Sequence, residues 1–430
     1  MDNLRSLFFW IFDSIKGGAI REHYNEIKFI MENFSDSKTT QLKQSHQDKL
    51  LRHAVQTTAF YSKYKNYKRL QDFPVINKNI IRDDIQNFLS SDYSKKKLHK
   101  VTTSGSTGTP FSVYWDKKKL LRNAADFIYF YELANYNVGN KLYYLRSWNP
   151  INRKSKFSCW LKNMVMEEST VFTPQQIEQF IQRLSEDKTK KVLWGYASSF
   201  TAISQVIAGR SYPDMVKSII TGSESLPDLT KRQLKEVFEC PVISRYSNIE
   251  NGLLAQQCDK YSEEFHINYG SYQVEVLSME GDYHVAPGER GRVVITDLFN
   301  YALPMIRYDT GDIAVYYENS ECEMKTPVFS IVEGRKCDCV TNTSGELLSA
   351  HLITNMMWKY EDIMQFQFIQ EGEKTYLIKL NCAKSFVRDN EIVQDYKNIL
   401  GDDAQIELMY VSEIPLLKSG KRKYIVNNCH

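Results

Sequence analysis

Residues 103–110 read TSGSTGTP, and they lie between an apolar residue, Val101, and a strand-like segment, FSVYW, at 111–115. Glycine lets the backbone turn tightly and approach a ligand closely, while exposed N–H and O–H groups can surround phosphate oxygens. The stretch is not a Walker loop, because it lacks the Gly-Lys-Ser/Thr ending and no helix is set up to follow it directly. A turn of this composition is by itself more often a hairpin than a phosphate site. Whether this stretch binds phosphate therefore has to be judged together with the other segments of the chain.

Strand-like and helix-like segments alternate on the carboxy-terminal side of this loop. The expected strands are Lys141–Leu145, Lys191–Trp194, Val216–Thr221 and Pro241–Ser244, and the expected helices are Leu120–Leu133, Gln175–Leu184, Ser198–Ala208 and Leu229–Phe238. Alternation at these lengths predicts a mainly parallel α/β sheet that is covered by helices on both faces.

Two segments with other patterns of secondary structure flank this α/β part. Residues up to about Asp92 read as helices, one over His46–Lys63 and another from about Lys78. From Phe265 to Tyr317, expected strands such as Tyr272–Leu277 and Gly291–Leu298 are joined by turns rich in Gly, Pro and Asp, as in a meander or small barrel. After Gly334-Arg335, strand–helix–strand–strand–helix patterning predicts one small α+β domain.

Composition bounds the class of protein. The chain has 430 residues, of which 42% are hydrophobic and 25% charged, so we expect a globular protein of more than one folding unit. A net charge of +3 does not indicate a nucleic-acid binder. Eight cysteines without a framework, no signal peptide and no apolar run long enough to span a bilayer predict a reduced, cytoplasmic protein.

An apolar stripe at helical spacing stands at the amino terminus. Its members are Leu4, Leu7, Phe8, Ile11, Phe12 and Ile15, with Arg5 and Lys16 nearby. Such a stripe can anchor a helix to a membrane surface. A helix packed on the body of the protein is the commoner outcome, and it is the one we expect here. The sequence thus allows at most peripheral membrane contact.

Five further segments follow the loop in order. They read TGSESL at 221–226, YSNIE at 246–250, RYDTGD at 307–312, EGRKCD at 333–338 and PLLKSGK at 415–421. Alone, each has an ordinary structural explanation as a turn, a surface pair or a basic tail. In series, they make the chain resemble the adenylate-forming (acyl-CoA synthetase-like) superfamily over nearly its whole length. Within the superfamily, the chain looks most like phenylacetate–CoA ligase and the CapK-type proteins of capsular polysaccharide gene clusters.

The resemblance implies a fold and a set of roles. The fold is an α/β N-terminal domain, 1–333, with parallel sheets, helices and a small barrel-like part, and a mobile α+β C-terminal lid, 334–430. The loop residues implied to hold the ATP phosphates are Thr103, Ser104, Gly105, Ser106, Thr107 and Gly108. Those implied around the nucleoside are Gly222, Ser223, Glu224, Tyr246, Asp312 and Arg335, with Glu250 as Mg²⁺ ligand and Lys421 as catalytic lysine of the lid.

The implied reaction joins a carboxylic acid to the α-phosphate of ATP and then transfers the acyl group to CoA or to another acceptor, such as an amine or a carrier. Bringing two anions together requires cations and oriented donors. Trp148, Trp194 and Tyr196 are expected near the acyl group. A catalytically weak nucleotide-binding scaffold of a polysaccharide assembly system, and a nucleotidyltransferase acting on a non-acid acceptor, stay open, as does a homodimer.

The chain departs from the superfamily pattern at three positions. Thr109 stands where many members have lysine, Ile249 where threonine commonly precedes the glutamate, and Cys337 at the hinge position. Thr109 weakens one phosphate contact, and at Ile249 a hydroxyl contact to the α-phosphate is either lost or supplied by Asn248. These departures affect the expected rate and nucleotide affinity more than the fold.

A zinc set is incomplete. Some relatives near this branch carry a structural zinc on a Cys…His…Cys-x-Cys set, and Cys258, His266 and Cys322 fall where three of its ligands would lie. The fourth thiol is missing, since Ser320 and Met324 stand on either side of Cys322. Structural zinc takes four N or S ligands, so the sequence favours loss of this site.

Overall fold

The structure is a computed structural model of the chain. It describes residues 2–102, 111–146, 148, 153–169, 173–258, 263–320, 322–335, 340–348, 350–358, 360, 362–382, 388–415 and 423–429. The amino-terminal part is helical, as expected, and consists of α1 (Asp2–Ile15), α2 (Ala19–Glu32), α3 (Ser37–Thr57), α4 (Lys78–Asp83) and α5 (Ile85–Phe88), with short 3₁₀ turns at Ser62–Tyr64, Leu70–Asp72 and Lys95–Lys97.

Capping residues decide where α3 and α4 begin. Asp36 accepts a hydrogen bond from the backbone N–H of Lys38, so α3 starts nine residues before the predicted His46. It also ends earlier than predicted, at Thr57, because Thr58 adopts an extended backbone. The predicted start near Lys78 is confirmed, and there the Asn77 side chain caps the free N–H groups of Asn79 and Ile80.

The α1 helix forms as predicted, but its stripe does not pack on the body. The six apolar side chains of the stripe are all exposed, from 45% at Ile11 to 77% at Ile15. The expectation of a buried stripe is therefore wrong. None of the helices in the described part of the chain is long and apolar enough to cross a membrane.

A parallel half-sheet forms where α/β alternation predicts it. Its strands are β3 (Lys141–Arg146), β4 (Met164–Glu168), β5 (Lys191–Tyr196), β6 (Ile219–Gly222) and β7 (Val242–Asn248), in the order β4-β3-β5-β6-β7. The helices are α6 (Lys117–Glu132), α7 (Lys156–Leu161), α8 (Pro174–Glu186), α9 (Ala197–Ile207) and α10 (Asp228–Phe238). Each expected strand and helix of this part is confirmed, with ends that differ by a few residues.

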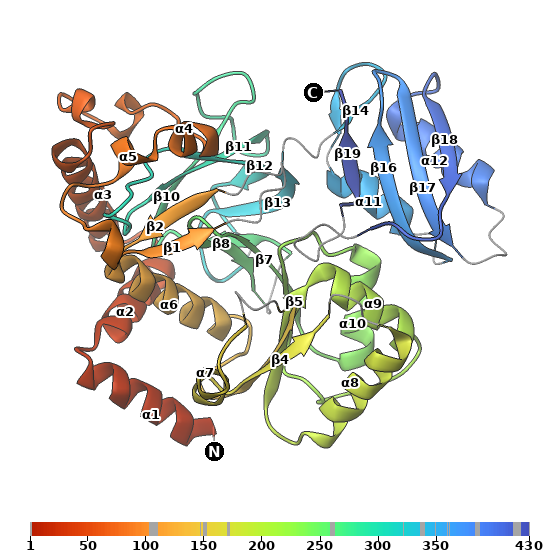
Figure 1. The fold of residues 1–430 in the computed structure, drawn as a ribbon, viewed down its shortest axis with the longest axis horizontal. Helices are drawn as coiled ribbons and strands as arrows, with labels where there is room; N and C mark the ends of the chain where they lie inside the picture. Colours follow the sequence, from red (N-terminus) through yellow and green to blue (C-terminus); the bar gives the residue numbers. More distant parts are fainter. Residues whose placement is uncertain are drawn as a thin grey trace.

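Successive side chains of these strands serve two cores, because the side chains of a strand point alternately to its two faces. Leu193, Ile219 and Val242 pack against α8, α9 and α10. Their neighbours Val192 and Ile220 pack on the other face with Tyr131 of α6. Helices therefore cover both faces of the parallel half, as expected (Figure 1).

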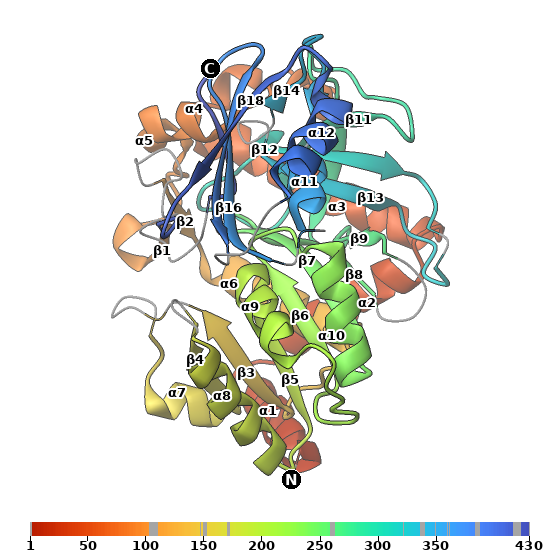
Figure 2. The same ribbon diagram turned by 90° about the vertical axis from the view of Figure 1, so that its right-hand side faces the viewer.

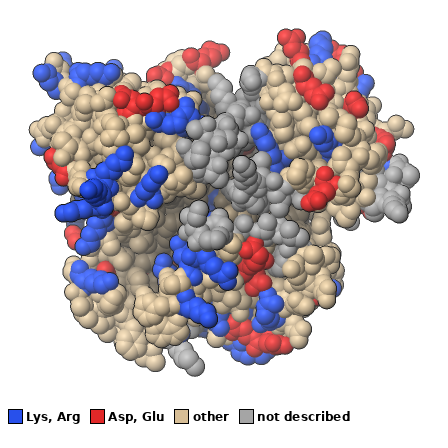
Figure 3. Space-filling view, in the orientation of Figure 1, with Lys and Arg blue, Asp and Glu red and all other residues tan. Residues whose placement is uncertain are grey.

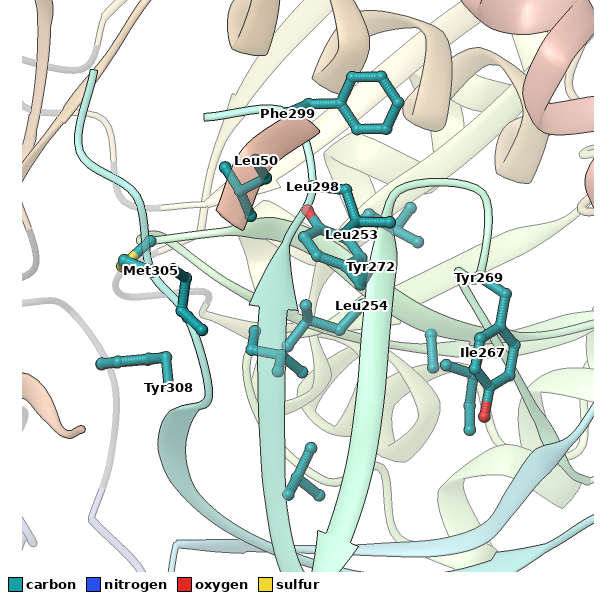
Figure 4. Packing of buried hydrophobic residues seen from close by; sticks show 14 of the residues in the cluster. Leu50, Leu253, Leu254, Ile267, Tyr269, Tyr272, Leu298, Phe299, Met305 and Tyr308 are labelled. Carbon is teal, nitrogen blue, oxygen red and sulfur yellow. The ribbon is translucent and has the colours of Figure 1, made fainter. Parts of the chain in front are cut away.

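The antiparallel strands continue the same sheet. They are β8 (Gly252–Gln257), β9 (Phe265–Ile267), β10 (Tyr272–Leu277), β11 (Arg290–Asp297), β12 (Tyr308–Tyr317) and β13 (Val328–Arg335). Hydrogen bonds join all of them to the parallel half in one eleven-stranded sheet, β10-β11-β12-β13-β9-β8-β7-β6-β5-β3-β4. Apolar side chains from β8, β9, β10 and the 298–308 segment pack together with Leu50 of α3 in the largest core (Figure 4).

The carboxy-terminal residues build a second, smaller sheet with its own core. Its strands β16 (Ile363–Gln370), β17 (Thr375–Cys382), β18 (Gln405–Tyr410) and β19 (Ile425–Asn427) lie in the order β18-β17-β16-β19. Helices α11 (Ala350–Trp358) and α12 (Asp389–Leu400) cover one face (Figure 2), and a two-stranded piece, β14 (Val340–Thr341) with β15 (Leu347–Leu348), precedes them. This confirms the predicted fold class, a large α/β part and a small α+β part.

Candidate active site

Several predicted site residues lie outside the described part of the chain. These are the loop residues Thr103, Ser104, Gly105, Ser106, Thr107 and Gly108, the lid residue Lys421, and two of the departures, Thr109 and Cys337. Arg335 is described through its backbone alone, which pairs with Asp312 across β12 and β13. The geometry of the site therefore rests on Gly222, Ser223, Glu224, Tyr246, Glu250 and Asp312.

The hairpin on either side of the loop is well defined. Strands β1 (His99–Thr102) and β2 (Ser112–Trp115) pair antiparallel, with Thr102 opposite Ser112 and their hydroxyls 2.9 Å apart. The hairpin expected from a turn of this composition is thus present. At its far end, Trp115 Nε1 donates a hydrogen bond of 2.9 Å to the carbonyl oxygen of Glu250. This bond holds the loop-bearing hairpin against the turn between β7 and β8.

Glu250 lies in that turn and is largely buried, with 8% of its surface exposed. Its Oε1 accepts a hydrogen bond of 3.3 Å from the hydroxyl of Tyr308, at the start of β12. The turn itself requires glycine at position 252. The φ of Gly252 is 103°, which is unfavourable for other residues, and a Cβ there would clash with the Asn123 side chain. The backbone of Glu250 is thus held by Trp115 of β2 and its carboxylate by Tyr308 of β12.

Tyr246 and Asp312 meet across the sheet. The Tyr246 hydroxyl donates a 2.7 Å hydrogen bond to Asp312 Oδ2 and lies 3.2 Å from the Thr310 hydroxyl. Burial raises the pKa of Tyr246 well above its usual value, so the phenol stays a donor. The sequence places these residues 66 positions apart, and the structure joins them directly. The buried Tyr246 therefore holds one carboxylate oxygen of Asp312, Oδ2, in place.

The Gly222–Glu224 segment leaves the carboxyl end of β6. Ser223 has a φ of 70° and is exposed. Glu224 Oε2 accepts a 2.9 Å hydrogen bond from the backbone N–H of Ser198, in the first turn of α9. A carboxylate there satisfies a free N–H group and the positive end of the helix. Glu224 thus has a structural role beside any contact with a nucleotide.

Asn248 is already engaged in the turn after β7. Its Oδ1 accepts a 2.8 Å hydrogen bond from the N–H of Asn251, and the neighbouring Ile249 is 46% exposed. A phosphate contact by Asn248 in place of the missing threonine would therefore have to use its amide nitrogen.

An aromatic cluster lies at the carboxyl ends of β3 and β5, where parallel sheets commonly bind ligands. Tyr144 stacks on Trp194 at 3.8 Å between ring centroids and meets Trp148 edge-on at 5.0 Å. Tyr196 is buried beside them on β5, and burial raises the pKa of its hydroxyl. The structure thus places Trp148 and Trp194, two of the residues expected near the acyl group, in one cluster.

Arg146 is a residue of this cluster that the sequence analysis missed. Its guanidinium lies over the rings of Tyr144 and Trp148, and Nη1 donates a 3.1 Å hydrogen bond to the Tyr144 hydroxyl. Its Nε–H is buried and has no hydrogen-bond partner among the described residues. A single arginine at the end of a strand carries no sequence signal. Only the rings that surround it set it apart.

The three expected zinc ligands meet in the structure. The sulfur atoms of Cys258 and Cys322 are 3.5 Å apart, and the ligand atoms of both and of His266 lie within 4.8 Å of one another. Nε2 of His266 is buried and has no hydrogen-bond partner in the described part of the chain, while Nδ1 lies 3.0 Å from the Thr326 hydroxyl. Burial lowers the pKa of His266 to about 4, so the ring is neutral. This donor set suits Zn²⁺.

We therefore expect the chain to hold about one equivalent of Zn²⁺ despite the missing fourth thiol. Metal analysis should find it, and a chelator should lower the midpoint of thermal unfolding, because the metal cross-links β8, β9 and the segment before β13. Cys322→Ser should remove both effects, and Cys159→Ser, at a free cysteine outside the set, should keep them. A chain that takes up no added zinc would contradict this expectation.

Comparison with solved structures shows a known fold. A crystal structure of 2-hydroxyisobutyryl-CoA ligase in the postadenylation state, in complex with R3-HIB-AMP, matches with a TM-score of 0.74, 13% identity, and coverage of 93% of this chain and 91% of that chain. The same ligase with 2-HIB-AMP and CoA in the thioesterification state matches with a TM-score of 0.60 and 16% identity, over 93% and 92% of the two chains. The fold is that of the adenylate-forming ligases.

Sequence comparison then points to one branch. Residues 340–428 match the CapK C-terminal domain family. Protein CapK of Staphylococcus aureus is 22% identical over 435 aligned positions, which cover 95% of this chain and 93% of CapK. The resemblance to the adenylate-forming superfamily and to its CapK-type members is thus confirmed.

Proposed function

We propose that the chain is an adenylate-forming ligase, which activates a carboxylic acid with ATP and then transfers the acyl group to an acceptor. The observation that carries this proposal is the Tyr246–Asp312 hydrogen bond together with the Trp115–Glu250 bond. These two bonds join the segments YSNIE (246–250) and RYDTGD (307–312) to each other and to the hairpin that carries the TSGSTGTP loop. The fold of the chain also matches that of a ligase whose crystal structure contains an acyl-AMP, and this match supports the same class of reaction.

On the ATP side, the loop at 103–108 and Glu250 are the proposed phosphate and metal contacts. Carboxylate oxygen is the donor that Mg²⁺ prefers, and the Tyr308 hydroxyl holds one oxygen of Glu250 in place. When bound, Mg²⁺ would neutralise charge on the phosphates. Asp312 would accept the ribose hydroxyls, and Tyr246, which orients it, would pack beside the base.

On the acid side, we propose the cluster of Tyr144, Trp148, Trp194 and Arg146 as the wall of the acyl site. The reacting carboxylate oxygen attacks the α-phosphorus, and the bond from phosphorus to the pyrophosphate oxygen breaks. Pyrophosphate leaves, and acyl-AMP remains. An acceptor nucleophile then takes the acyl group and AMP leaves. Both half-reactions need charge neutralised by fixed cations and donors, because anions meet in each.

The second half-reaction requires the acceptor to reach the acyl-AMP. We infer that residues 334–430 act as the mobile lid, since the small sheet and its helices, which follow β13 in the chain, have a core of their own. CoA is bound in the ligase structure in the thioesterification state, and an amine or a carrier of surface-polysaccharide synthesis is the other acceptor that we propose, from the resemblance to CapK-type proteins. The cytoplasm is the location we infer, because ATP and reduced thiols are available there and the described cysteines are free.

Glu250→Gln tests the nucleotide site. The variant keeps the shape and the acceptor of the Tyr308 hydroxyl, but it lacks the negative charge that a magnesium ion needs. We expect Mg²⁺-dependent ATP affinity to fall at least about tenfold, equal to about 1.4 kcal/mol, as measured by calorimetry with and without Mg²⁺. Glu236→Gln, an exposed residue of α10, is the matched control. Unchanged binding by Glu250→Gln would remove Glu250 from the site.

ATP-dependent pyrophosphate release, screened over a panel of carboxylic acids, tests the reaction. Acid-dependent release supports the ligase. Binding of ATP with no release for any acid would favour the nucleotide-binding scaffold, and release that depends on a non-acid acceptor would favour a nucleotidyltransferase.

A further inference from the structure

The outer face of α1 is apolar and exposed. Leu4, Leu7, Phe8, Ile11, Phe12 and Ile15 recur at helical spacing, and their exposed fractions are 58%, 54%, 67%, 45%, 49% and 77%. A surface helix of a globular protein normally turns such a stripe toward the core. Here it points away from the core.

Specific contacts hold α1 in this orientation. Its inner residue Trp10 packs on Tyr24 of α2 and under the guanidinium of Arg21, at 5.7 Å and 4.7 Å. The buried carboxylate of Asp13 accepts hydrogen bonds from the backbone N–H groups of Ile20 and Arg21, in the first turn of α2. Since Asp13 caps α2 from inside α1, rotation of α1 toward the core would break these bonds. The exposed stripe is therefore part of the folded arrangement.

Helix α7, far away in the sequence, extends the same surface. Arg5 Nη1 donates a 2.8 Å hydrogen bond to the carbonyl oxygen of Trp160, which joins the two helices. Phe157, Trp160 and Leu161 are exposed by 70%, 64% and 54%, and the two rings stack at 6.1 Å. We call the nine exposed apolar residues of α1 and α7 the α1–α7 face.

Basic residues border this face. The segment 153–162 reads RKSKFSCWLK and contains Arg153, Lys154, Lys156 and Lys162 but no acidic residue. All four of these side chains are exposed, as is Lys16 at the end of α1. Figure 3 shows the lower left of the molecule, where α1 and α7 lie, as a largely uncharged surface with Lys and Arg side chains beside it.

We propose that the α1–α7 face docks on the surface of an anionic lipid bilayer. Apolar and aromatic side chains with Lys and Arg at their border are what an interfacial helix needs, since the rings enter the acyl boundary and the cations meet the headgroups. A second copy fits less well. In a two-fold dimer the same patch meets itself, so the basic segments 153–162 of both copies would be brought together.

Vesicle co-sedimentation of the full-length chain tests the proposal. We expect binding to vesicles of phosphatidylcholine mixed with phosphatidylglycerol, and binding should weaken as salt rises, because salt screens the basic residues. Replacing both Phe8 and Phe12 by serine should weaken binding at least about tenfold. Lys154→Gln with Lys156→Gln should weaken it about tenfold on the mixed vesicles and leave the weaker binding to pure phosphatidylcholine unchanged.

Exposed residues elsewhere provide the controls. Met364→Ser, at a residue of β16 that is 54% exposed, should bind vesicles like the unchanged chain. The midpoint of thermal unfolding and ATP affinity of the Phe8 and Phe12 variant should also be unchanged, because neither ring packs in the core. The proposal is overturned if this variant binds vesicles normally. It is equally overturned if the unchanged chain does not bind vesicles and instead forms a dimer, while the variant is monomeric.

Discussion

Lys421→Ala should abolish formation of acyl-AMP and leave acyl transfer from supplied acyl-AMP intact. Lys421 lies outside the described residues, and its role is inferred from the PLLKSGK segment at 415–421. In the superfamily this lysine reaches the site only when the lid closes for adenylation, where its ammonium neutralises charge shared by the acid and the α-phosphate. Loss of one such contact typically costs ~10²–10³ in rate.

Separate assays of the two half-reactions on one purified variant decide the matter. Pyrophosphate release reports the first, and AMP release from supplied acyl-AMP plus acceptor reports the second. Lys418→Ala, three residues earlier in the same segment, is the control and should affect neither. If Lys421→Ala slows both half-reactions equally, the two-state lid is wrong for this chain. If it slows neither, Lys421 belongs to a solvated basic tail.

Lys119→Met should destabilise the large domain by about 3–5 kcal/mol. Lys119 and Asp297 form an ion pair of 2.7 Å in which both side chains are fully buried, and the ammonium also donates a 3.0 Å hydrogen bond to the Tyr272 hydroxyl. Methionine fills similar space but leaves the Asp297 carboxylate buried without its partner. The urea midpoint of unfolding, followed by tryptophan fluorescence, measures the loss.

Two further variants separate charge from packing at this pair. Lys117→Met, at an exposed lysine in the same helix, should leave the midpoint unchanged. Adding Asp297→Asn to Lys119→Met should recover part of the loss, because the amide is neutral and its oxygen can still accept from the N–H of Phe299. A midpoint for Lys119→Met equal to that of the unchanged chain would show that the pair contributes nothing measurable.

Local sequence patterns predicted the large domain well where they depend on near neighbours. Strands that alternate with helices predict a sheet covered on both faces. The structure confirms this, since Leu193 and Ile219 lie in one core and their neighbours Val192 and Ile220 lie in the core on the other face. The start of α3 was missed because it depends on one capping residue, Asp36, beyond the apolar repeat. The role of Glu224 at the start of α9 was missed for a similar reason, since the N–H group of Ser198 that it accepts from lies 26 residues earlier in the chain.

The sequence by itself determined the fold class, the order of the segments and the chemistry they can support, because periodicity and motif spacing are properties of neighbouring residues. Only the tertiary structure decided which side chains meet. It brought Tyr246 to Asp312, gathered Tyr144, Trp148 and Trp194 around Arg146, and turned the α1 stripe outward. That last outcome depends on Asp13 and Trp10, whose partners lie on α2, and a helical repeat alone cannot say whether its apolar side meets the core or the surroundings.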